Sequence, residues 1–259
     1  MPLSKNQKEE IYSILARTLR AKFKSYKPET NSMPFHTRLL GKDRLALFSF
    51  IQSLNTTFGT SIFEPVAVAI AAQKFKQAEK QQTAGSQISS QAQLTIQKIL
   101  DDLHTGATSP NSESEIEAIR KVCQAGEIKT VKLTKVDIKL IDQKDKILLI
   151  DLKTAKPNTN EFKQFKRTLL EWVAVTLCDN PKVVVNSLIA IPYNPYDPKP
   201  YSRWTMRGML DIENEVKVAE EFWDFLGGNG TYKALLDVFE NVGIDLRHEI
   251  DEQFAKFRV

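Results

Sequence analysis

The sequence has few of the residues that build zinc sites and disulfide frameworks. Its 259 residues include two cysteines, Cys123 and Cys178, which lie far apart in the chain. A zinc knuckle needs closely spaced cysteines and a disulfide framework needs several pairs, so neither is expected. The histidines His36, His104 and His248 are scattered, which argues against a histidine-based metal site.

Long apolar runs are also missing. The chain begins with MPLSKNQKEE, which is polar and lacks the apolar core of a signal peptide. The most apolar helix-like run, residues 66–72, is too short to cross a bilayer. We therefore expect a cytoplasmic protein with no membrane segment.

The composition is ordinary for a globular protein, with 42% hydrophobic and 26% charged residues. A chain of this length can bury a full core, and we expect a single domain over residues 1–259. Within it we expect a mainly helical part at 1–125, an αβ core at 126–192, and a loop followed by helices at 193–259. The net charge of +4 is compatible with nucleic acid binding but does not demonstrate it.

Residues 135–157 predict two strands joined by a polar turn. The first strand alternates apolar residues at Val136, Ile138 and Leu140. The second is a continuous apolar run over 147–150, which is typical of a strand buried on both faces. Asp137 interrupts the first strand and Asp151 ends the second. Charges are rarely placed in buried strands unless they are paired or bind a metal, so this hairpin is the candidate site.

Lys153 follows Asp151 by two residues, so both side chains point to the same face of the strand. Two carboxylates can bind a hard cation such as Mg²⁺, and a neighbouring lysine can orient a water molecule. This chemistry suits metal-assisted phosphodiester hydrolysis. In the alternative, Asp137 and Asp151 simply mark strand ends and Lys153 is a solvated charge.

The Asp-x-Lys triplet alone is a weak signal. It also occurs at Asp137–Lys139, Asp142–Lys144 and Asp197–Lys199. A site at Asp137–Lys139 would need an upstream acid in a strand, for which Glu127 is the candidate. The sequence around Glu127 is less apolar, so we prefer Asp151–Lys153.

Helical patterns surround the hairpin. Helices are predicted over residues 4–24 with Ser4 as N-cap, within 35–54, from Pro65 into the basic residues near 80, over 91–103 and 112–123, and from Asn158 or Thr159 to Asn180. Residues 80–93 are predicted as a loop or frayed helix end, 182–191 as a buried strand, and the chain from about Asp211 as helical. This order predicts an α/β protein with a central sheet.

The set Asp137…Asp151-Leu152-Lys153, in a helix–strand–strand–strand–helix–strand order, resembles the PD-(D/E)XK nuclease superfamily. Val136 stands where that motif often has proline. The segments FGTSIFEPVAVAIA, DLKTAKPN and EEFWDFLGGNGTYKALLDVFENVG resemble the TdeIII-like family of type II restriction endonucleases. The resemblance implies a restriction-endonuclease-like core, with a central mixed β-sheet flanked by helices and helical additions at both ends.

The resemblance also implies roles for individual residues. Asp137 and Asp151, with the backbone carbonyl of Leu152, would bind Mg²⁺, and Lys153 would position the attacking water. Glu64, at the predicted start of a helix, resembles the extra helix glutamate of such nucleases, which holds metal or water. In the alternative, Glu64 only favours the helix dipole.

The function implied is cleavage of double-stranded DNA at a short palindrome, GGNCC by resemblance, by a homodimer paired with a cognate DNA methyltransferase. Two alternatives are a repair or recombination nuclease that recognises DNA structure, and an inactive DNA-binding protein on the same fold.

Candidate DNA contacts lie on both sides of the strand at 182–191. Arg203 and Arg207, with Lys199, occur in a segment rich in proline and aromatics, and arginine is the usual partner of guanine. In the alternative, Trp204 is a core residue and the arginines pair with Asp211 or Glu213. Phosphate contacts are predicted at Lys156 and at the basic helix start Lys163, Lys166 and Arg167.

Overall fold

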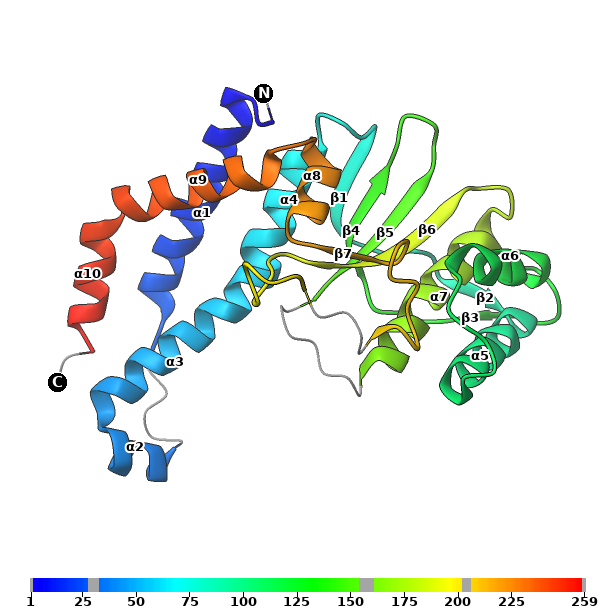
Figure 1. Cartoon of the computed structure of the whole chain (residues 1–259), viewed down its shortest axis with the longest axis horizontal. Helices are drawn as coiled ribbons and strands as arrows, with labels where there is room; N and C mark the ends of the chain where they lie inside the picture. The colour runs from blue at the N-terminus through cyan, green and yellow to red at the C-terminus, as the bar shows by residue number, and fades with distance from the viewer. Residues whose placement is uncertain (1, 28–32, 154–160, 202–205, 258–259) are drawn as a thin grey trace.

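A mixed sheet of five strands lies at the centre of the protein in the order β1-β4-β5-β6-β7 (Figure 1). The strands are β1 (Gln77–Gln82), β4 (Val136–Ile141), β5 (Ile147–Leu152), β6 (Val185–Ile191) and β7 (Val216–Val218). The pairs β1–β4 and β4–β5 are antiparallel, whereas β5–β6 and β6–β7 are parallel. A small second sheet pairs β2 (Gln87–Ser89) with β3 (Ile128–Thr130). This computed structural model describes residues 2–27, 33–153, 161–201 and 206–257.

Helices cover both faces of the large sheet. They are α1 (Lys5–Ser25), α2 (Pro34–Leu40), α3 (Lys42–Thr57), the π-helix η1 (Phe58–Phe63), α4 (Glu64–Ala71), α5 (Ser90–Thr105), α6 (Ser112–Val122), α7 (Phe162–Asp179), α8 (Glu220–Gly227), α9 (Thr231–Asp245) and α10 (Arg247–Ala255). The α/β architecture with a central mixed sheet and helical additions at both ends is therefore confirmed. None of the described helices combines the length and apolar character needed to cross a membrane.

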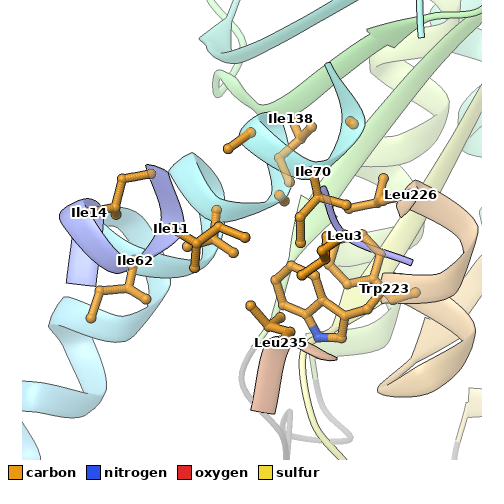
Figure 2. Packing of buried hydrophobic residues seen from close by; sticks show 14 of the residues in the cluster. Leu3, Ile11, Ile14, Ile62, Ile70, Ile138, Trp223, Leu226 and Leu235 are labelled. Carbon is orange, nitrogen blue, oxygen red and sulfur yellow. The ribbon is translucent and has the colours of Figure 1, made fainter. Parts of the chain in front are cut away.

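Two hydrophobic cores lie on opposite faces of the sheet. One joins the sheet to α1, α4, α8 and α9, and Figure 2 shows Ile11, Ile70 and Trp223 packed together within it. The other joins the sheet to α5, α6 and α7. Full burial of one large apolar side chain contributes roughly 1.5–3 kcal/mol, so these two cores supply most of the driving force for folding. The α8 aromatics Phe222 and Trp223 are buried in the first of these cores.

The central hairpin folds as the sequence predicts. Side chains of β4 alternate between buried and half-buried, and β5 is buried along its middle. The Asp142 carboxylate accepts hydrogen bonds from the backbone N–H groups of Lys144 and Lys146 at 2.8 and 2.9 Å, which fixes the turn. The predicted N-cap is also confirmed, because Ser4 and Gln7 form a capping box at the start of α1.

Three local predictions are wrong. The helix expected to run from Pro65 into the basic residues ends at Ala71, and the segment predicted as a loop contains β1 and β2. β1 is an edge strand of polar residues that pairs with β4, so it carries no apolar alternation. The region from about Asp211, predicted as helical, contains β7, whose three residues are too few to show a strand period.

Candidate active site

Three carboxylates and two lysines, Lys135 and Lys153, line a single cavity of about 480 Å³ at the end of the β4–β5 hairpin. Asp137 comes from β4, Asp151 from the end of β5, and Glu64 from the start of α4. Lys153 lies just beyond β5, and α7 closes the wall with Phe165 and other side chains. The structure thus brings together the four residues that the sequence singled out as catalytic, and Leu152 also lines this cavity.

A hydrogen bond across the hairpin fixes Asp137. Its Oδ2 accepts from the backbone N–H of Leu152 at 2.8 Å, so one oxygen is held against the neighbouring strand. The same bond fixes the backbone between Asp151 and Lys153. Because β4 and β5 are adjacent antiparallel strands, the two predicted aspartates meet at one end of the sheet.

Asp151 and Lys153 form an ion pair, with Nζ and Oδ2 separated by 2.8 Å. Their predicted placement on one face is therefore confirmed. The Lys153 ammonium also lies 4.4 Å from the centre of the Phe165 ring, a cation–π contact that fixes its direction. Asp151 is 5% exposed, and burial together with the nearby Asp137 carboxylate raises its pKa to about 6, against the opposing effect of Lys153.

Glu64 is 2% exposed and lies inside continuous helical backbone. Its predicted place at the start of a helix is confirmed, since α4 begins at Glu64, but η1 runs directly into α4 and Phe63 has helical dihedral angles, so this helix start is not a free end. The alternative role, stabilisation of a helix dipole, loses its basis for the same reason. Burial raises the pKa of Glu64, and Asp137 adds to this shift, whereas a hydrogen bond from Gln81 opposes it.

Gln81, on β1, belongs to the site although no sequence motif indicated it. Its Nε2 donates to both carboxylate oxygens of Glu64, at 3.0 and 2.9 Å, and to Oδ1 of Asp137 at 3.2 Å. Gln81 lies in the polar segment predicted as a loop, where a glutamine among other glutamines gives no signal. Only the pairing of β1 with β4 places it beside the carboxylates.

The side chains that line the cavity include the type of ligand that a hard divalent cation prefers. Three carboxylates supply oxygen donors of the kind that Mg²⁺ prefers, and their burial beside one another favours a bound positive charge. Among the described residues, no three His, Cys, Asp and Glu side chains are already arranged as a metal cage. The Gln81 amide contacts oxygens of Glu64 and Asp137, and the Lys153 ammonium contacts one of Asp151.

Of the predicted DNA-contacting residues, Lys156 and Arg203 lie outside the described part of the chain, as does Trp204. Lys199 and Arg207 are exposed in the described structure. Lys163 is also at the surface, where it pairs with Asp101 at 3.2 Å. Lys199 and Arg207 can reach a ligand from the surface, whereas Lys163 would have to leave Asp101 to do so. The contact of these three residues with DNA stays a prediction.

The predicted phosphate contact of Lys166 is wrong. Lys166 is 0% exposed, and its Nζ lies 2.7 and 2.6 Å from the two carboxylate oxygens of Glu215. It also contacts Glu115, so it joins α7 to α6 and to the turn before β7. Sequence periodicity could not reveal this, because both partners are far away in the chain.

The mixed sheet, with acidic residues and a lysine at the end of its central hairpin, defines a nuclease of the restriction-endonuclease-like class. Comparison with known proteins agrees: residues 3–243 match the sequence model of the family described as type II restriction endonuclease, HinfI. The chain belongs to this family, and it is an enzyme, a site-specific deoxyribonuclease. The more specific resemblance to TdeIII-like enzymes stays a prediction.

Curated relatives carry the same description. The chain is 29% identical to the type II restriction enzyme MjaII of Methanocaldococcus jannaschii, over 93% of this chain and 72% of the relative. It is 24% identical to the type II restriction enzyme HgiEI of Herpetosiphon aurantiacus, over 86% of this chain and 81% of the relative. The likeness therefore spans nearly the whole chain, including the helical additions.

Replacement of Lys166 by Met should destabilise the fold by about 3–5 kcal/mol, because it leaves Glu115 and Glu215 buried without a cation. Urea unfolding at neutral pH measures this loss. Lys163→Met is the matched control on the same helix, since its exposed pair with Asp101 is worth at most about 1 kcal/mol. Equal losses in the two variants would contradict a structural role for Lys166.

Replacement of Asp151 by Asn should change stability in a pH-dependent way. The folded-state pKa of about 6 lies above the ordinary value of 3.8, so proton uptake by Asp151 stabilises the folded wild type, fully so below about pH 4. This contribution of Asp151 protonation to the free energy of unfolding is lost as the pH rises through 6. The free energy of unfolding of Asp151→Asn relative to wild type should therefore increase from pH 4 to pH 7, by up to about 3 kcal/mol.

The measurement is urea unfolding in EDTA across this pH range. Asp142→Asn is the control, because backbone N–H groups of Lys146 and Lys144 lower the pKa of Asp142. The contribution of this carboxyl to stability is lost only as the pH falls below about 4, so the relative stability of Asp142→Asn should stay nearly constant over this range. A flat profile for Asp151→Asn would show that burial does not raise the pKa of this carboxyl.

Proposed function

We propose that this restriction endonuclease makes Mg²⁺-dependent double-strand cuts at a short palindromic DNA site. The observation that carries the proposal is the convergence of Asp137, Asp151 and Lys153 on one cavity, with Glu64 beside them. The alternative in which the two aspartates merely mark strand ends does not explain why Asp151 is buried and paired with Lys153.

The residues divide the chemistry between them. Asp137, Asp151, Glu64 and the backbone carbonyl of Leu152 would hold Mg²⁺, which when bound stabilises charge on a phosphoryl oxygen. Lys153 positions the attacking water, since its ammonium is held at the cavity by Asp151 and Phe165. The water oxygen forms a bond to phosphorus as one P–O bond of the DNA backbone breaks, and the leaving oxygen takes up a proton.

DNA contacts are proposed for the basic residues that the sequence indicates. Lys156 and Lys163 would bind backbone phosphates, which position the duplex without reading sequence. Lys199, Arg203 and Arg207 would contact base edges, with arginine paired to guanine O6 and N7. By the family resemblance the site read is GGNCC. A cognate DNA methyltransferase would protect the same site in the cytoplasm of the host.

We infer that the enzyme acts as a homodimer, because a symmetric site needs one active site for each strand. Large apolar side chains are exposed along α2 and α3, which extend away from the sheet (Figure 1). Phe35 and Leu39 are 81% and 83% exposed, and Phe48 and Ile51 lie on the next helix. Scattered exposed apolar residues are normal, but several large ones on two successive helices support association with a second copy.

Cleavage of plasmid and phage DNA with Mg²⁺ tests the function. Discrete fragments that map to GGNCC are expected, whereas a smear would indicate a nuclease without sequence specificity.

Asp151→Ala and Lys153→Ala should each lower the cleavage rate at least about 100-fold, because each removes a group next to the reacting phosphate. Lys139→Ala is the matched control from the rival triplet and should cut normally. Wild-type rates for Lys153→Ala would show that the site is assigned wrongly.

Sedimentation of the free protein tests the dimer. The wild type should sediment as a dimer, and Leu39→Ser combined with Phe48→Ser should shift it toward monomer, because both changes place hydroxyl groups in the apolar contact. Leu94→Ser is the control, since Leu94 is an exposed leucine on α5. A dimer that survives the double substitution would place the interface elsewhere.

A further inference from the structure

Gln81 has a backbone conformation that ordinary strand residues avoid. Its φ of 56° lies in the left-handed region, although it is not glycine and sits within β1. Its neighbours Lys80 and Gln82 pair with Ile138 and Val136, so Gln81 faces Asp137 on the adjacent strand. Such conformations are costly for residues with a Cβ, and they cluster at functional sites.

The side-chain amide of Gln81 donates hydrogen bonds to the active-site carboxylates. As described above, Nε2 donates to both oxygens of Glu64 and to one of Asp137. The amide is neutral, so it brings the two acids together without cancelling the negative charge that attracts a cation. A lysine in this place would supply hydrogen bonds but would also repel the metal.

The contrast with Gln82 separates this role from simple strand formation. The Gln82 amide donates only to the backbone carbonyl of Lys80, at 3.2 Å on the exposed side of β1. Both residues belong to the same edge strand, yet only Gln81 adopts the left-handed conformation. The unfavourable backbone therefore coincides with the residue whose side chain enters the site.

We propose that Gln81 is a positioning residue that holds Glu64 and Asp137 in the arrangement in which they bind a divalent cation. The proposal rests on the metal-dependent function proposed above. Gln81 acts through Glu64, because two of its three contacts go to that carboxylate. Groups that orient metal ligands typically change metal affinity 10- to 100-fold when they are removed.

The test is binding of Mn²⁺ alone to the full-length protein, measured by titration calorimetry. Gln81→Gly removes the amide and relieves the backbone at φ 56°, so this variant should stay folded. Gln81→Asn tolerates the same backbone but is one carbon shorter. Both should weaken Mn²⁺ binding at least about tenfold and raise by a similar factor the Mg²⁺ concentration that gives half-maximal cleavage. Gln82→Gly is the matched control and should bind Mn²⁺ as the wild type does.

A double-mutant cycle with Glu64→Gln shows whether Gln81 acts through Glu64. In the Glu64→Gln background, Gln81→Gly should weaken Mn²⁺ binding by less than about twofold, because the shared carboxylate is gone. Folded Gln81→Gly protein that binds Mn²⁺ with wild-type affinity would overturn the proposal, and so would fully independent effects in the cycle. If the wild type binds Mn²⁺ and Gln81→Gly weakens it, but no DNA is cut, the positioning role stands and the proposed nuclease function fails.

Discussion

Burial of negative charge at the end of the β4–β5 hairpin is the constraint on which the rest of the site depends. Glu64 and Asp151 are almost fully buried, and an isolated carboxylate in such a place would be strongly unfavourable. The fold offsets this cost with the amide of Gln81, which donates to Glu64, and with the ammonium of Lys153, which pairs with Asp151. The backbone N–H of Leu152 holds the third carboxylate, Asp137. Two lysines, Lys135 and Lys153, line this cavity beside three acids, so a small excess of negative charge remains, which favours binding of a cation.

A second buried charge cluster shows what distinguishes a site from a structural pair. Lys166 lies between Glu115 and Glu215 with both carboxylates in direct contact, and all three side chains are shielded from solvent. The catalytic carboxylates instead border a cavity of about 480 Å³, so a metal ion and a phosphate group have space to enter. Both clusters place lysine beside acids, and access to the cavity, rather than residue type, separates their roles.

The helical part at residues 1–125 is not independent of the catalytic core. It supplies Glu64 from α4 and Gln81 from β1, and β1 completes the antiparallel side of the sheet. On the other side, β7 from the carboxy-terminal part extends the parallel strands. The family match over residues 3–243 fits this arrangement, since elements from nearly the whole chain build one sheet and one site.

Local pattern in the sequence by itself determined the hairpin, the capping of α1 and the core helices, because alternation, continuous apolar runs and caps depend on neighbouring residues. It also determined that Asp151 and Lys153 point to one face, since residues two apart in a strand share a face. Only the tertiary structure decided that β1 is a strand, that Glu64 lies inside a continuous helix, that Gln81 joins the carboxylates and that Lys166 is buried. Each of these depends on partners far away in the chain, and a polar edge strand or a buried lysine gives no periodic signal of its own.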